Sequence, residues 1–154
     1  MEMQEIQGVA LVANEDTILR QFSEQKQRLM DFQDDLEDII PTLLSANGIE
    51  VANISFRIKN EDSLRKKIQF KRKYQQLTDV TDLIGCRIVT LFELDMERVL
   101  EVLTREFEMI ELVDKRKKSL EGYIDFGYNS IHVILRFSDA RCQLVEYQRY
   151  RDIK

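Results

Sequence analysis

The sequence predicts an α+β domain in which a mixed β-sheet is flanked by helices and preceded by a long N-terminal helix. Three observations predict this class. Apolar residues recur at helical spacing early in the chain, β-branched segments then alternate with amphipathic ones, and the predicted order is α-β-α-β-α-β-β. The 154 residues suffice for a single domain, with a helical region over 1–48 and a sheet-containing core over 49–154.

The long helix is predicted from Asn14, which has the side chain of an N-cap residue. The apolar positions that follow keep a period close to 3.6 residues: Ile18, Leu19, Phe22, Leu29, Phe32, Leu36, Ile39 and Ile40. Pro41 removes an amide donor and should kink or interrupt the helix. A last turn is expected over Thr42–Ala46, before the stop signal Asn47-Gly48.

The later elements are short and follow from local signals. Asn60 should cap a basic helix, and a run rich in β-branched residues that is apolar on both faces should form a buried strand. The expected elements are a strand at about 51–58, a helix over Ser63–Arg72, the buried strand Leu83–Phe92, a helix over Asp95–Phe107, and strands over Met109–Val113 and Tyr128–Phe137. Residues 141–147 either begin another strand or run irregularly.

Composition excludes several classes of protein. The chain is 44% apolar and 33% charged, and no apolar run approaches the ~18 residues of a membrane span. Its acidic N-terminus does not resemble a secretory signal, so we expect a cytoplasmic protein without a membrane partner. Cys86 and Cys142 stand apart in a chain with one histidine, which excludes a zinc finger or a disulfide scaffold.

Charge is distributed unevenly along the chain. The net charge is −5, yet residues 57–73 hold eight Lys and Arg against two acidic residues. A local excess of this kind indicates a polyphosphate or nucleic-acid partner, or else a solvated helix face. The patch is too small, and too poor in aromatic residues, for us to expect DNA as a partner.

The first candidate cluster lies in this basic segment. Arg57 and Lys59 are two residues apart on a predicted strand, so both side chains leave the same face. Ser63 lies in the first turn of the next helix, and Lys67 follows four residues later on the same side. Such cations beside a helix N-terminus suit a triphosphate. A basic, solvated helix explains the same spacing equally well.

The second cluster lies at the start of the predicted buried strand. Asp82 precedes Gly85 and Arg87, and a carboxylate at the mouth of a strand is a natural ligand for phosphate-bound Mg²⁺. Gly85 would allow close backbone approach. Capping of the preceding turn by Asp79 or Asp82 is the structural alternative.

The third cluster lies on the last predicted strand. Tyr128, Ser130 and His132 alternate on one face of it. A tyrosine there can stack on a base, and a histidine can donate to a phosphate or a sugar hydroxyl. A half-buried strand with an incidental histidine is the alternative.

Taken in order, these three clusters resemble the synthetase domain of the RelA/SpoT family. The residues that carry the resemblance are Arg57-Ile-Lys59 with Ser63 and Lys67, Asp82-Leu-Ile-Gly85-Cys-Arg87-Ile, and Gly127-Tyr128-Asn-Ser130-Ile-His132. The resemblance runs from about residue 50 to 137, and the N-terminal helix is similar to the lead-in of small, single-domain members.

The resemblance implies a nucleotidyltransferase-like fold and a GTP pyrophosphokinase. Such an enzyme moves the β,γ-pyrophosphate of ATP to the 3′-hydroxyl of GDP or GTP, which gives the alarmones ppGpp and pppGpp of the stringent response. The implied roles are ATP binding by Arg57, Lys59, Ser63, Lys67 and Arg87, Mg²⁺ binding and catalysis by Asp82, and acceptor binding by Lys117, Tyr128, Ser130 and His132.

Two departures from the family pattern affect the expected acceptor and the expected turnover. The stretch Leu120–Phe126 replaces a basic, Asn-containing loop, so the tRNA 3′ end, the acceptor of some toxins of this family, is the alternative acceptor. Family members also continue into a strand with a Glu-x-Gln-x-Arg motif. Glu146 and Gln148 have part of its spacing, but their flanks resemble the segment before that strand. We therefore expect a fragment or a shortened member with poor turnover.

Two further expectations concern activity and assembly. A catalytically degenerate module that binds a nucleotide or a protein partner is the alternative from a different class. The sequence carries no counterpart of the family's hydrolase motifs, since it has one histidine. The oligomeric state is left open, a homo-oligomer included.

Overall fold

The computed structural model describes residues 2–116 and 129–154. Its elements, in chain order, are α1 Glu2–Glu24, α2 Lys26–Ala46, β1 Val51–Ile58, α3 Glu61–Lys71, η1 Leu77–Asp79, β2 Ile84–Thr90, α4 Glu93–Glu106, β3 Phe107–Asp114, β4 Ile131–Phe137, η2 Arg141–Gln143 and η3 Val145–Tyr150. This mixture of helices and antiparallel strands confirms the α+β class. No helix in the two described ranges is long and apolar enough to cross a bilayer.

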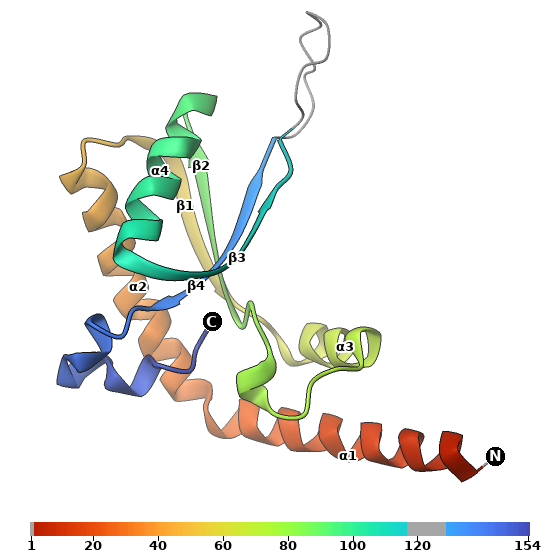
Figure 1. Cartoon of the computed structure of the whole chain (residues 1–154). Helices are drawn as coiled ribbons and strands as arrows, with labels where there is room; N and C mark the ends of the chain where they lie inside the picture. The colour runs from red at the N-terminus through yellow and green to blue at the C-terminus, as the bar shows by residue number, and fades with distance from the viewer. Residues whose placement is uncertain (1, 117–128) are drawn as a thin grey trace, which may run out of the picture.

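The four strands form two antiparallel pairs, β1 with β2 and β3 with β4. Figure 1 shows the pairs close together at one end and diverging toward the other, with α2 and α4 on the same side of both. The expected strands are present, but β2 and β4 do not pair with each other, so the described residues do not form one continuous mixed sheet.

The long N-terminal helix is divided at a different point from the one expected. The helix begins at Glu2 rather than after Asn14, and it breaks at Gln25. Pro41 lies inside α2 without ending it. The carbonyl that a proline at this position leaves unpaired belongs to Glu37, which is exposed, so water can satisfy it. The break at Gln25 lets α1 run along α3 while α2 packs against the strands (Figure 1).

The segments around the predicted basic helix follow their local signals. The side chain of Asn60 caps α3 by accepting a hydrogen bond from the backbone N–H of Ser63 at 2.8 Å, as the sequence predicts. The strand predicted to be buried on both faces is only half-buried. Ile84 and Ile88 pack against the core, whereas Arg87 and Val89 are exposed, because the helices cover one face of β2 only.

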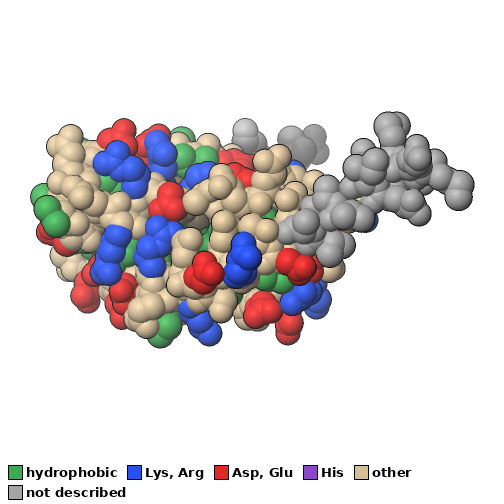
Figure 2. Space-filling view, turned by 90° about the horizontal axis from the view of Figure 1, so that it is seen from below, with side chains coloured by type: hydrophobic (Ala, Val, Ile, Leu, Met, Phe, Trp, Pro, Cys, Tyr) green, Lys and Arg blue, Asp and Glu red, His purple; other side chains and the backbone are tan. Residues whose placement is uncertain are grey.

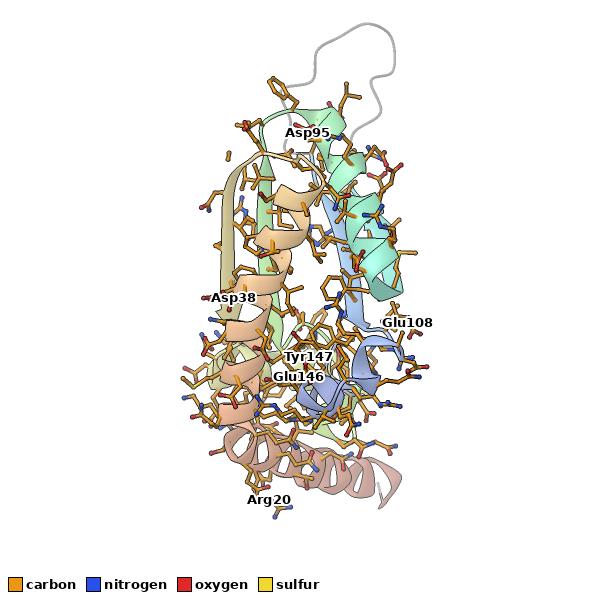
Figure 3. All side chains as sticks on the ribbon, turned by 90° about the vertical axis from the view of Figure 1, so that its left-hand side faces the viewer. Arg20, Asp38, Asp95, Glu108, Glu146 and Tyr147 are labelled. Carbon is orange, nitrogen blue, oxygen red and sulfur yellow. The ribbon has the colours of Figure 1, made fainter. Side chains whose placement is uncertain are left out.

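An aromatic cluster joins the C-terminal segment to α2 and the second strand pair. Phe137 is 1% exposed. The centroid of its ring lies 4.9 Å from the ring centroid of Phe32 and 5.7 Å from that of Phe107. Tyr150 stacks on Phe32 at 4.6 Å. Residues 141–150 form 3-10 turns, so the irregular alternative is correct, and Figure 3 shows Glu146 and Tyr147 in these turns beside α2.

Candidate functional site

Arg57 lies on the outer face of the first strand pair. The apolar residues Ile54, Phe56 and Ile58 of β1 pack against the core, so Arg57, between two of them, leaves the opposite face. Arg57 lies opposite Gly85 in the register of β1 and β2. A methyl group added at Gly85 would meet Arg57 Cγ at 3.7 Å, an ordinary contact, so Gly85 leaves room beside the arginine side chain.

Two lysines converge on Asp82. Lys59 Nζ lies 3.5 Å from Asp82 Oδ2, and Lys67 Nζ donates a hydrogen bond to Asp82 Oδ1. Lys67 also donates to the carbonyl oxygen of Thr81 at 2.7 Å. The two lysine side chains are only 14% and 16% exposed, whereas that of Asp82 is 52% exposed. The cluster therefore presents one accessible carboxylate held between two shielded ammonium groups.

The backbone holds Asp82 in an unusual conformation. Its φ is 60°, in the left-handed region that Asp and Asn enter more readily than most other residues. The next residue, Leu83, accepts a hydrogen bond from the backbone N–H of Lys59 at 2.8 Å, which ties the end of β1 to the start of β2. This pairing brings Lys59 and Asp82 together, although they are far apart in the sequence.

Asp79 has a structural role that separates it from Asp82. Its Oδ2 accepts hydrogen bonds from the backbone N–H groups of Gln75 at 3.0 Å and Gln76 at 3.1 Å, at the start of η1. These hydrogen bonds, that of Gln75 above all, hold the pKa of the Asp79 carboxyl below its usual value. Of the two candidate capping residues, Asp79 caps the turn and Asp82 faces the lysines.

We expect the Asp79→Ala variant to lose about 1 kcal/mol of unfolding free energy at pH 7, because it loses this cap. A carboxyl with a lowered folded-state pKa stabilises the fold above its unfolded pKa of 3.8, and that stabilisation is lost as the pH falls through the folded value. Below pH 4, the free energies of unfolding of the variant and the unchanged chain should therefore become more similar. Urea unfolding at several pH values measures them. Asp62→Ala, which removes an exposed carboxylate from α3, is the control, and equal narrowing in both variants would contradict the assignment.

The remaining predicted site residues lie in three places. Ser63 is exposed in the first turn of α3, and Arg87 is exposed on β2. Ser130 and His132 lie at the start of β4, where the carbonyl of Ser130 accepts from the backbone N–H of Lys115 at 2.8 Å. Lys117 and Tyr128 lie outside the described residues.

Ser130 and His132 come from a different strand pair than the lysine cluster, which consists of Lys59, Lys67 and Asp82. β2 begins beside α3, whereas β4 ends at the end of the strands where β2 begins and runs in the opposite direction (Figure 1). Asp82, Ser130 and His132 line one cavity of about 640 Å³. The structure thus brings Lys59, Lys67 and Asp82 into contact, whereas Ser130 and His132 belong to the segment of the second strand pair.

Two nearby residues were missed by sequence reasoning. Lys26, at the start of α2, lines a second cavity of about 500 Å³ together with Arg57 and Lys59. Tyr74 is 6% exposed, and its ring lies 5.9 Å from Lys67 Nζ. Burial raises the pKa of Tyr74, which keeps the phenol neutral. Neither residue belongs to a motif in the sequence, so only their position in space indicates them.

The basic segment is partly neutralised by its surroundings. Arg65 pairs with Glu15 of α1 at 3.0 Å and with Glu61 of its own helix at 3.1 Å. Figure 2 shows Lys and Arg side chains interspersed with Asp and Glu on the face seen from below. The cations on this face therefore do not form one uniform basic surface.

The donor set around Asp82 suits a metal ion only when a ligand shares it. In the described parts of the chain, no group of three or more His, Cys, Asp or Glu side chains is placed to hold a metal ion by itself. Mg²⁺ bound to phosphates takes one or two protein carboxylates and keeps several waters. The single accessible carboxylate of Asp82, beside two lysines, fits that arrangement.

Comparison with known proteins identifies a family. A family model described as "Region found in RelA / SpoT proteins" matches residues 56–151. This range includes the lysine cluster, all of β2 and β4, and both C-terminal 3-10 turns. No curated protein and no solved structure matches the chain.

Proposed function

The chain belongs to the RelA/SpoT family, and from this premise we propose that it is a pyrophosphokinase that transfers the β,γ-pyrophosphate of ATP to the 3′-hydroxyl of GDP or GTP. One observation carries the proposal. Lys59 and Lys67, both largely shielded from solvent, converge on the exposed carboxylate of Asp82 at the junction of β1, α3 and β2. Shielded ammonium groups attract phosphate oxygens more strongly than lysines in bulk water do.

The lysine cluster is the proposed site of the ATP phosphates. Lys59 and Lys67 neutralise phosphate charge, and Arg57, which lines a cavity of about 500 Å³ together with Lys59, adds a guanidinium that can bind two phosphate oxygens at once. Asp82 would hold Mg²⁺ together with the phosphates, and this ion supplies neutralisation of the charge that develops on the transferred group. The shift of Asp82 from the lysines to a metal ion would release both ammonium groups toward the nucleotide.

The proposed transfer forms one bond and breaks one. The acceptor 3′-oxygen bonds to the β-phosphorus of ATP, the bond from that phosphorus to the oxygen bridging to the α-phosphorus breaks, AMP leaves, and the 3′-hydroxyl proton is released. Positioning and charge neutralisation account for most of the catalysis of such transfers. Ser130 and His132 are proposed for the acceptor, with Lys117 and Tyr128.

One experiment tests both the activity and its acceptor. The chain is incubated with γ-labelled ATP, Mg²⁺ and either GDP, GTP or deacylated tRNA. Label in a guanosine product is the expected result. Label on tRNA would replace the acceptor with the tRNA 3′ end, which the non-basic stretch 120–126 favours. Nucleotide binding without transfer to any acceptor would overturn the activity and indicate a binding module.

Lys67→Ala should weaken ATP binding at least tenfold, which corresponds to about 1.4 kcal/mol, because it removes a charged contact from a shielded site. Lys66→Ala is the matched control, since Lys66 is the adjacent residue on α3 and is exposed. Its effect should stay below about twofold, as expected for a screened surface charge. Titration calorimetry measures the ATP affinity of both variants. An equal loss of affinity in the two would mean that the phosphates bind elsewhere.

A further inference from the structure

The structure divides the cations of the basic segment 57–73 into two groups, and the proposed function uses only one of them. Arg57, Lys59 and Lys67 belong to the candidate phosphate site, and Arg65 is paired with acidic side chains. The remaining four cations of the segment are exposed, namely Lys66, Lys71, Arg72 and Lys73. In the part of the chain that the structure describes, none of these four forms an ion pair. Their positive charge is therefore available to an anionic partner.

An exposed aromatic ring lies among these four cations. Phe70 is 83% exposed, and it lies one helical turn from Lys66 on the face of α3 opposite the buried residues Leu64 and Ile68. Lys71 Nζ lies 5.9 Å from the centroid of the Phe70 ring, within the range of a cation–π contact. We call Lys66, Phe70, Lys71, Arg72 and Lys73 the α3 patch. It combines positive charge with a ring on which another ring can stack.

Local contacts hold two of the cations at the end of α3. Arg72, the C-cap residue, donates a hydrogen bond from Nε to the carbonyl oxygen of Gln69 at 3.3 Å. Lys73 Nζ lies 5.5 Å from the ring centroid of Tyr74, which is buried. Side chains that are already held in place lose less conformational freedom when they bind a ligand. The α3 patch is thus partly ordered before any ligand arrives.

We propose that the α3 patch binds a short single strand of RNA. Its phosphates pair with the four cations, and one base stacks on Phe70, since every base has a face that can stack on an aromatic ring. Unstacked bases of this kind are characteristic of the loops and ends of RNA. The inference does not rest on the proposed transfer, because the α3 patch contains none of the residues assigned to ATP, Mg²⁺ or the acceptor.

Other anionic partners fit the α3 patch less well. A membrane surface takes up a helix with a broad apolar face, whereas Phe70 is the one large apolar side chain that is exposed within residues 61–76. An RNA duplex keeps its bases paired and stacked inside the helix, out of reach of the ring. A bare polyphosphate pairs with the cations and gains nothing from the ring. Only a single strand uses both features of the patch.

The test uses the whole chain, without ATP, and a fluorescent RNA strand of about twelve nucleotides that ends in a 3′-phosphate. The 3′-phosphate leaves no terminal hydroxyl acceptor, so failure here leaves the proposed function untouched. Fluorescence anisotropy measures the affinity. With four phosphates neutralised, its logarithm should fall with the logarithm of the salt concentration at a slope of about −2.8, which is about a 50-fold loss between roughly 50 and 200 mM salt. Phe70→Ala should weaken binding by about fivefold or more, because it removes the stacking ring.

Phe92→Ala is the matched control, because Phe92 is 70% exposed before α4 and lies outside the α3 patch. It should change the affinity for RNA by less than about twofold, since it leaves the patch intact. Three results would overturn the proposal: equal affinities of the Phe70 and Phe92 variants, equal binding of the single strand and of its duplex, or binding to phosphatidylserine vesicles that requires Phe70 while RNA does not bind. The last would assign the patch to a membrane surface.

Discussion

Asp82→Asn should abolish the effect of Mg²⁺ on ATP affinity and strengthen the binding of metal-free ATP. In the structure, the Asp82 carboxylate pairs with both Lys59 and Lys67, so it competes with phosphate oxygens for these ammonium groups. An amide removes the negative charge and with it the metal ligand. We expect Mg²⁺ to raise the ATP affinity of the unchanged chain at least tenfold, and that of the variant less than twofold.

The choice of asparagine follows from the backbone at this position. Asp82 has a φ of 60°, which asparagine tolerates and alanine does not, so Asp82→Ala would mix a folding defect with the loss of charge. Asp62→Asn is the control, since Asp62 is an exposed carboxylate in the first turn of α3. Calorimetry with Mg²⁺ and with EDTA measures each affinity. An unaltered response to Mg²⁺ in the Asp82 variant would remove this residue from the metal site.

Phe137→Ala should lower the free energy of unfolding by about 3–5 kcal/mol, the usual cost of truncating a buried aromatic residue. Phe137 is 1% exposed, and its ring lies within 6.1 Å of the rings of Phe32, Phe107, Tyr147 and Tyr150. The loss is a large fraction of the 5–15 kcal/mol typical of a domain. It should also loosen the C-terminal turns, which pack on this ring.

Urea unfolding followed by circular dichroism measures this change. Phe92→Ala is the matched control, because Phe92 is 70% exposed and its truncation should shift stability by less than about 0.5 kcal/mol. Phe137→Leu should lose less than the alanine variant, since leucine refills much of the cavity. A cost below 1 kcal/mol for Phe137→Ala would mean that the aromatic cluster does not stabilise the core.

α2 contributes residues both to the hydrophobic core and to the cavity that Asp82 lines. Its buried face supplies Phe32 to the aromatic cluster, and Leu36 and Ile40 to the lining of the cavity of about 640 Å³. At its N-terminal end, Arg28 bonds to Asp152 at 2.7 Å, and Arg149 bonds to Asp31 at 3.0 Å. Mutations in this helix should therefore affect both the second strand pair and the C-terminal turns.

Local patterns predicted most of the elements because their causes are local. The strand at 51–58, the capping of a helix by Asn60 and the amphipathic helix that became α4 depend on residues within a few positions of one another. The alternation of side chains along a strand likewise predicted that Arg57 and Lys59 leave the same face. The family resemblance rested on motifs of the same short range.

The predictions that failed concern how one element meets another. Pro41 was expected to kink or interrupt the helix, yet α2 continues past Pro41 and the break lies at Gln25, where α1 turns away to run along α3. β2 was expected to be buried on both faces, because an apolar run does not show how many of its faces find a partner. Asp79 and Asp82 were equivalent candidates for the cap until their contacts separated them.

The sequence by itself determined the α+β class, the order of the elements and the residue types of the candidate site, since periodicity and capping act over one or two turns of chain. Only the tertiary structure decided that Lys59, Lys67 and Asp82 lie in contact, and that among the described residues β2 pairs with β1 and β4 pairs with β3. Such contacts depend on strand pairing and helix packing between segments distant in sequence, and no local pattern encodes the energy of those pairings.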